Sequence, residues 1–169
     1  MKTGLIILSM LLLLAGCGEE EDLGISAQSV EARVISVIDG DTIKVEFEGE
    51  EYSVRYIGIN TPEMGYGERT GEECAQQATD ANYQLVNGQT VRLERDVSDY
   101  DGFGRLLRYV YIGDLMINQM LVQAGWAEVV SYPPDTREFE RFREIEQDAA
   151  AVLVGCHAFD IFDDDTYER

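Results

Sequence analysis

Three short segments in which apolar and polar residues alternate follow one another near the start of the chain, and tight turns separate them. A period of two is typical of strands that bury one face. The turns are Asp39-Gly40-Asp41 and Glu48-Gly49-Glu50, and Asp-Gly pairs favour hairpin connections. The strands are expected at residues 30–38, 42–47 and 52–59. This pattern predicts an antiparallel meander and limits the chain to folds that begin with a sheet or a barrel.

Helical and extended segments follow the meander. Apolar residues recur every three or four positions in three places, which predicts helices at residues 72–86, 117–124 and 138–153. Two further strands are expected at residues 90–95 and 106–112. Five short strands with helices inserted after the third and the fifth predict a β-barrel plus α fold, an OB-type barrel with about three helices.

The N-terminal residues precede this fold. Lys2 is followed by an apolar run that is short for a permanent transmembrane helix and ends in Leu14-Ala15-Gly16-Cys17. These four residues resemble the lipobox of bacterial lipoproteins, in which a signal (here residues 1–16) is removed and the cysteine receives lipid. A plain secretory signal with a chance cysteine is the alternative. Residues 17–28 are acidic and polar, as in a flexible tether.

Removal of the signal leaves roughly 150 residues, the size of one domain with its own core. We expect this domain at residues 29–158, with an acidic tail at 159–169. The expected location is outside the cell membrane, or in the periplasm or at an outer membrane, with the lipid as anchor. Cys74 and Cys156 remain, and in an exported protein an even pair favours a disulfide over two free thiols.

Acidic residues dominate the charge of the chain. There are 33 acidic and 13 basic residues, for a net charge of −20, and lysine occurs only at Lys2 and Lys44. This balance disfavours binding of nucleic acid through a broad basic surface. It favours a protein that works in high salt, where the screening length falls to about 3 Å.

The third predicted strand carries residues suited to phosphate chemistry. Arg55 lies on the strand, and Glu63 follows Pro62 just beyond its end, so the two charges lie at opposite ends of a short rigid element. A guanidinium binds phosphate well, and a carboxylate can accept a proton from water. An ordinary salt-bridged strand would show the same pair.

Hard oxygen ligands gather in the same region. Asp41 lies in the first turn, whereas Asn60 and Thr61 end the third strand. If the first and third strands are neighbours, the Asp41 carboxylate, the Asn60 side chain and the Thr61 carbonyl supply three oxygens for Ca²⁺. Taken alone, the turn indicates only a hairpin.

Three motifs occur in a fixed order on these elements: Asp39-Gly40-Asp41-Thr42, then Arg55 with Thr61-Pro62-Glu63, then Asp101-Gly102-Phe103-Gly104-Arg105. Together they resemble the staphylococcal nuclease (thermonuclease) family, over nearly all of the chain from Val30 onward. The segment from Leu121 to Ala127 and the two cysteines are also similar to those of family members.

The resemblance implies a calcium-dependent endonuclease that hydrolyses single-stranded or denatured DNA, and RNA as well, and that is expected to be a monomer. It implies the following roles: Glu63 as general base on the attacking water, Arg55 and Arg105 at the scissile phosphate, Asp41, Asn60 and Thr61 as Ca²⁺ ligands, and Asp39 close to the metal.

The sequence departs from the family pattern at three places. Asn60 stands where the best-known member has aspartate, so we expect weak Ca²⁺ binding, with a Kd of about 10⁻⁴–10⁻³ M. Phe103 replaces a tyrosine, and Tyr132 alone remains of the tyrosines that contact nucleotide in the family.

Two other functions compete with the nuclease. One is an OB-type binding module that has lost catalysis, and the other is an acidic surface lipoprotein that binds a protein partner. The net charge favours the second of these. The presence of Glu63, Arg55 and Arg105 disfavours both, because loss of catalysis would leave these positions free to change.

Overall fold

The computed structural model describes residues 24–25, 28–67, 69–162 and 167. The predicted signal at residues 1–16, Cys17, most of the tether and part of the acidic tail lie outside these residues. Among the helices that the structure does describe, none has the length and apolar character needed to cross a membrane.

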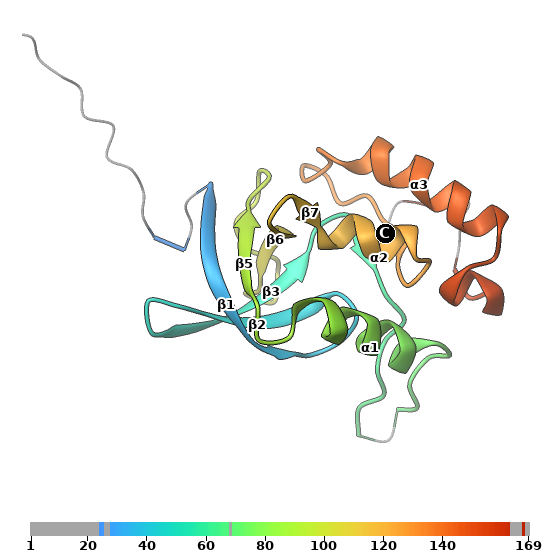
Figure 1. The fold of residues 1–169 in the computed structure, drawn as a ribbon, viewed down its shortest axis with the longest axis horizontal. Helices are drawn as coiled ribbons and strands as arrows, with labels where there is room; N and C mark the ends of the chain where they lie inside the picture. Colours follow the sequence, from blue (N-terminus) through green and yellow to red (C-terminus); the bar gives the residue numbers. More distant parts are fainter. Residues whose placement is uncertain (1–23, 26–27, 68, 163–166, 168–169) are drawn as a thin grey trace, which may run out of the picture.

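Five strands close into a barrel (Figure 1). The first three form the predicted antiparallel meander, β1 also pairs with β5, and β5 pairs with β6. A parallel pairing of β3 with β6, in which Val54 lies opposite Leu106, closes the ring. The strand bounds are β1 Ser29–Val37, β2 Thr42–Phe47, β3 Glu50–Tyr56, β5 Thr90–Glu94 and β6 Leu106–Ile112. The prediction of a five-stranded OB-type barrel is therefore confirmed.

Alternate residues of the strands fill the barrel. In β1 the buried side chains are Val30, Ala32 and Val34, as the alternation predicts. A shift of register between Val34 and Ser36 then ends the alternation. Alternation over residues 30–38 predicts Ile38 on the same face as Val34, but Ile38 lies beyond the end of β1 and is 45% exposed.

Three helices lie outside the barrel, and α2 packs against both β6 and α3 (Figure 1). Their bounds are α1 Ala75–Val86, α2 Ile117–Gln123 and α3 Phe139–Ala151. Helix α1 begins three residues later than predicted, because Cys74 before it adopts a left-handed backbone with φ of 68°. Smaller elements are β7 Leu115–Met116 and the 3₁₀ helix η1 Gly155–Phe159.

Helical periodicity in residues 138–153 predicts one buried stripe on α3, and the observed buried face differs from it; the predicted stripe is Phe139, Phe142, Ile145, Ala149 and Val152. Phe142 and Ala149 are buried as expected, but Val152 lies beyond the end of the helix and is 69% exposed. The same periodicity places the Arg and Glu residues of α3 on its solvated face, but Glu146 is buried, and its Oε1 accepts a hydrogen bond from the backbone N–H of Val129 at 2.6 Å. The carboxylate of Glu146 thus connects α3 to the short strand that contains Val129.

The prediction of one strand over residues 52–59 is wrong in its second half. Strand β3 ends at Tyr56, Gly58 has a φ of 78°, and β4 (Ile59–Asn60) turns away to pair with β8 (Glu128–Val129). A Cβ at position 58 would lie 3.2 Å from the ring of Phe142, so both the backbone angle and the contact favour glycine. This break brings the end of β4 to the turn between β1 and β2.

Candidate active site

A cavity of about 430 Å³ opens at the barrel rim, between the β3–β4 junction and the loop before β6. Five of the residues singled out in the sequence line it, namely Arg55, Asn60, Glu63, Arg105 and Tyr132. They come from β3, β4, the segment after β4, the loop that ends just before β6 and the segment after β8. The fold thus brings together residues that are far apart in the chain.

Asp41 lies beside this cavity and is only 4% exposed. Its Oδ2 accepts hydrogen bonds from the backbone N–H of Thr61 at 2.8 Å and from Thr61 Oγ1 at 3.0 Å. Its Oδ1 accepts one from Thr42 Oγ1 at 3.0 Å and lies 3.1 Å from Arg55 Nε. The first turn and the end of β4 are therefore joined through one buried carboxylate.

Almost all of the N–H groups of Arg55 face acceptor atoms of the protein. Its Nη1 donates to the carbonyls of Tyr56 and Ile59, both at 2.8 Å, and its Nη2 donates to Asn60 Oδ1 at 3.1 Å. Nε faces Asp41. A guanidinium has five N–H groups, so one Nη2 hydrogen is left for a ligand.

Arg105 is arranged differently. Its Nε lies 2.6 Å from Asp101 Oδ2, and its terminal nitrogens make no hydrogen bond with any described residue. The side chain is 32% exposed and stacks near the ring of Phe103, 5.5 Å from the centroid. Burial raises the pKa of Asp101, but hydrogen bonds from Arg105 and Phe103 outweigh it and hold the pKa below its usual range. Asp101 thus orients Arg105 while leaving its fork open to an anion.

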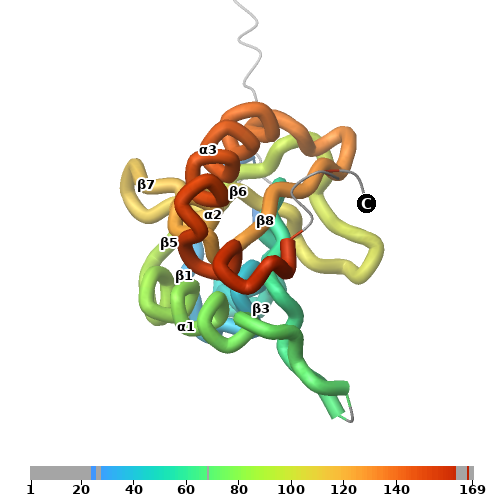
Figure 2. The backbone as a smooth tube through the Cα atoms, turned by 90° about the vertical axis from the view of Figure 1, so that its right-hand side faces the viewer, coloured from blue at the N-terminus to red at the C-terminus, as the bar shows by residue number. Residues whose placement is uncertain are grey.

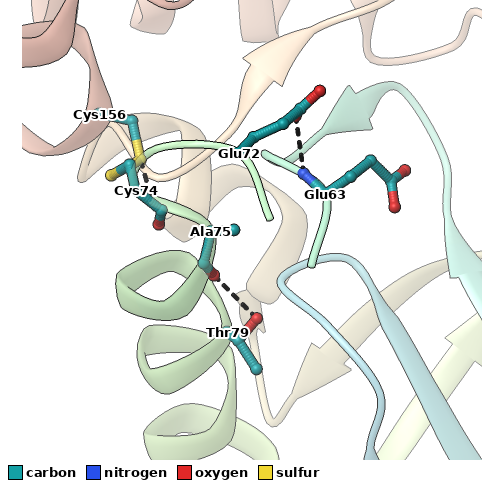
Figure 3. Close-up of a disulfide and its surroundings, with 6 residues drawn as sticks. All are labelled: Glu63, Glu72, Cys74, Ala75, Thr79 and Cys156. Atoms are coloured by element: carbon teal, nitrogen blue, oxygen red, sulfur yellow. Dashed lines mark hydrogen bonds between the residues drawn. A yellow bond between two sulfur atoms is a disulfide. The ribbon is translucent and has the colours of Figure 1, made fainter. Parts of the chain in front are cut away.

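Glu63 lies just beyond Pro62, with an exposed side chain at the cavity. Its carboxylate has no hydrogen bond or ion pair with the described residues, and it points away from the disulfide and α1 (Figure 3). Only its backbone is held, because its N–H donates to Glu72 Oε2 at 2.8 Å. A carboxylate without partners can accept a proton from water.

The side-chain and backbone oxygens near Asp41 are of the chemical type that binds a hard cation. Burial, and after it the charge of Asp41, raise the pKa of Asp39 to about 6, so a cation close to this pair would favour the charged form of Asp39. The Asp41 carboxylate, the Asn60 amide and the Thr61 carbonyl are oxygen ligands of the type that Ca²⁺ takes. No group of three His, Cys, Asp or Glu side chains suited to a metal occurs within the described part of the chain. The fit therefore depends on neutral oxygens as well as on Asp41.

Glu128 is a residue that the motifs did not indicate. It lies opposite Asn60 in the β4–β8 pair, is buried, and its Oε1 accepts a hydrogen bond from Asn60 Nδ2 at 2.9 Å. Asn60 thus donates to Glu128 while its oxygen accepts from Arg55. An aspartate cannot make both contacts, because it has no N–H to donate.

Asp135 is a second such residue. It lines the cavity, is 5% exposed, and its Oδ1 accepts hydrogen bonds from the backbone N–H groups of Val97 and Ser98 at 2.9 and 2.8 Å. It therefore holds the loop that leads to Arg105. In the sequence it follows two prolines and indicates only a chain break. Tyr132 lies nearby, exposed at the cavity.

Comparison with known proteins defines the family. The model of staphylococcal nuclease homologues matches residues 53–156. The chain belongs to the staphylococcal nuclease family. It is 36% identical over 117 residues to the thermonuclease of Staphylococcus hyicus, with 69% of each chain covered. Against endonuclease YncB of Bacillus subtilis the identity is 39% over 114 residues, which cover 66% of this chain and 54% of that protein. The thermonuclease of Staphylococcus intermedius is 38% identical over 101 residues, or 60% of each chain.

Proposed function

We propose that this member of the staphylococcal nuclease family is a calcium-dependent nuclease that hydrolyses phosphodiester bonds of DNA and RNA. Family membership and the thermonuclease and endonuclease relatives support a hydrolase of this class. The observation that carries the mechanism is that Arg55, Glu63 and Arg105 line one cavity. Export and lipid attachment at Cys17 belong to the proposal and are supported by the sequence Leu14-Ala15-Gly16-Cys17.

In this mechanism Glu63 is the general base. Its carboxylate lies at the cavity without a partner among the described residues, so it can take a proton from the attacking water. A base placed in this way contributes roughly 10²–10⁴-fold to the rate.

The two arginines bind the phosphate to different extents. Attack on a phosphodiester places negative charge on the non-bridging oxygens, which a guanidinium fork stabilises. Arg105 offers both terminal nitrogens, whereas Arg55 offers one hydrogen and mainly holds Asp41 and Asn60 in place. Arg105 is therefore the main phosphate ligand of the proposal.

Asp41, Asn60 and Thr61 would hold the Ca²⁺, and Asp39 would add negative charge nearby. When bound, the cation supplies Lewis-acid activation of the phosphate. Because Asn60 is neutral, the binding is expected to be weak, with a Kd of about 10⁻⁴–10⁻³ M. Tyr132 would contact the substrate at the edge of the cavity.

The test is a cleavage assay on the lipid-free chain that begins after Cys17. Denatured DNA and RNA are incubated with Ca²⁺ or with a chelator, from low to molar salt. We expect cleavage with Ca²⁺ only. Glu63→Gln should lower the rate by about 10²–10⁴-fold with an unchanged Tm, whereas the control Glu140→Gln, on the exposed face of α3, should leave the rate unchanged.

The net charge of −20 favours one alternative, an acidic lipoprotein without catalysis. Absence of metal-dependent cleavage under every condition would refute the nuclease. If the inactive chain still bound single-stranded DNA, it would be an OB-type binding module. If it did not bind, the acidic lipoprotein would be the better explanation.

A further inference from the structure

The segment after β4 projects from the barrel and returns to α1, so that its two ends meet (Figure 2). Glu63 and Glu72 lie at these ends. The N–H of Glu72 donates to the carbonyl of Glu63 at 2.9 Å, and the N–H of Glu63 donates to Glu72 Oε2 at 2.8 Å. A Cβ on Gly65 would lie 2.5 Å from the nitrogen of Gly71, so the two sides touch just beyond these bonds. The backbone of Glu63 is therefore fixed across the loop.

Glu72 is itself attached to a rigid part of the molecule. Two residues later, Cys74 forms a disulfide with Cys156 of η1, with the Cα atoms 5.7 Å apart (Figure 3). Both sulfurs lie in a buried cluster with Ala78 of α1. The N–H of Ala75 donates to the carbonyl of Glu72 at 3.3 Å, which joins Glu72 to the start of the helix.

On the other side of Glu63 the nearest hydrogen bonds lie two residues away, where the N–H and Oγ1 of Thr61 donate to Asp41. The Glu63 side chain is exposed and makes no polar contact with the described residues, and Pro62 before it has no N–H to donate. The position of its carboxylate at the cavity therefore depends on its backbone. A displacement of about 1 Å at such a group can lower a rate 10²-fold.

We propose that Glu72 is a positioning residue that fixes Glu63 at the cavity, and that the Cys74–Cys156 disulfide is its anchor. This inference rests on the proposed function, in which Glu63 is the general base. The feature required of Glu72 is an acceptor oxygen, which glutamine also provides and alanine lacks.

The test compares Glu72→Ala, Glu72→Gln and the matched control Glu73→Ala in the same lipid-free chain. We measure kcat and KM on denatured DNA at saturating Ca²⁺, together with Tm. Glu72→Ala should lower kcat by about 10–100-fold with KM within twofold. The kcat of Glu72→Gln should stay close to that of the unmodified chain, and the kcat of Glu73→Ala should be the same as that of the unmodified chain.

A second comparison separates positioning from a general loss of stability. In the Glu63→Gln background, Glu72→Ala should cause no further loss of kcat, because Glu72 acts only through Glu63. Reduction of the disulfide, at a temperature where circular dichroism shows the chain to be folded, should lower kcat in the unmodified chain and have little effect on Glu72→Ala.

The outcomes are distinct. A Glu72→Ala chain with normal kcat, or one that loses Tm but keeps kcat at low temperature, would overturn the inference alone. Equal losses of kcat in Glu72→Ala and Glu72→Gln would also overturn it, because glutamine keeps the acceptor oxygen that alanine lacks. An unmodified chain without metal-dependent cleavage would overturn the proposed function, and this inference with it.

Discussion

The two hydrogen-bond partners of Asn60 favour asparagine over aspartate at this position. Its amide donates to buried Glu128 and accepts from Arg55. Asn60→Asp would place a carboxyl group at hydrogen-bond distance from that of Glu128, so the two must either repel each other as anions or share one proton. We expect a loss of about 1–3 kcal/mol in the free energy of unfolding, measured with urea in the presence of a chelator.

The matched control for this change is Glu128→Gln. Its amide can donate to an aspartate at position 60, so the double variant should recover most of the stability and bind Ca²⁺ more tightly than the unmodified chain. A double-mutant cycle gives the coupling. Equal stability of Asn60→Asp and the unmodified chain in chelator would contradict the argument.

Substitution of Arg55 should mainly lower stability, whereas substitution of Arg105 should mainly lower activity. Arg55→Ala leaves the buried carboxylate of Asp41 without its cation and should cost about 3–5 kcal/mol of stability. Arg105→Ala breaks a partly exposed pair and should cost about 1 kcal/mol or less, while lowering kcat by about 10²-fold or more. Urea unfolding and kcat measure the two effects, with exposed Arg141→Ala as control. Larger destabilisation by Arg105→Ala would reverse the assignment.

At the scale of elements, the loop that leads to Arg105 is held by Asp135 from another part of the chain. Asp135→Ala would leave the N–H groups of Val97 and Ser98 without an acceptor. We expect a loss of about 1–3 kcal/mol in unfolding free energy and a lower kcat, because Arg105 follows this loop. Asp135→Asn keeps an acceptor oxygen and should be milder, and Asp114→Ala in the exposed β6–β7 turn should change neither quantity. A normal kcat in Asp135→Ala would contradict this role.

The strands and helices could be predicted from local patterns to within a few residues, because alternation and helical periodicity reflect burial directly. The errors have tertiary causes. Gly58 interrupts the third strand with a φ of 78° and leaves room for Phe142 of α3, and α1 begins only after Cys74, which has a left-handed backbone and is bonded to Cys156. Neither partner is a neighbour in the sequence, so no local pattern signals the contact.

The residues of the candidate site also fall into those that local motifs indicate and those that only the folded structure reveals. Residues within short motifs, such as Arg55, Glu63 and Arg105, could be singled out from the sequence, and the structure places them at one cavity. Glu128 and Asp135 could not be singled out, because each is defined by a group that only the folded chain brings near it: a side-chain amide for Glu128 and two backbone N–H groups for Asp135.

For the molecule as a whole, the dominant property is a net charge of −20. Exposed glutamates line the β1–β3 hairpins at positions 31, 46, 48, 50 and 51, and only Lys44 there is paired with one of them, at 3.8 Å from Glu51. Repulsion between such groups extends over about 10 Å at 0.1 M salt and about 3 Å at 1 M. Salt should therefore stabilise the folded chain and reduce its repulsion of nucleic acid.

We expect Tm and kcat/KM on denatured DNA to rise from dilute buffer toward molar KCl, whereas a nuclease that binds through a basic surface would lose affinity. The attractive contribution of two phosphate-binding arginines has a slope of only about −1.4 in log K against log salt on single strands, which screening of the acidic surface can offset. Changing the five hairpin glutamates to glutamine should flatten the dependence of Tm on salt. A Tm that falls steadily as KCl rises would show that repulsion among the acidic groups does not control stability.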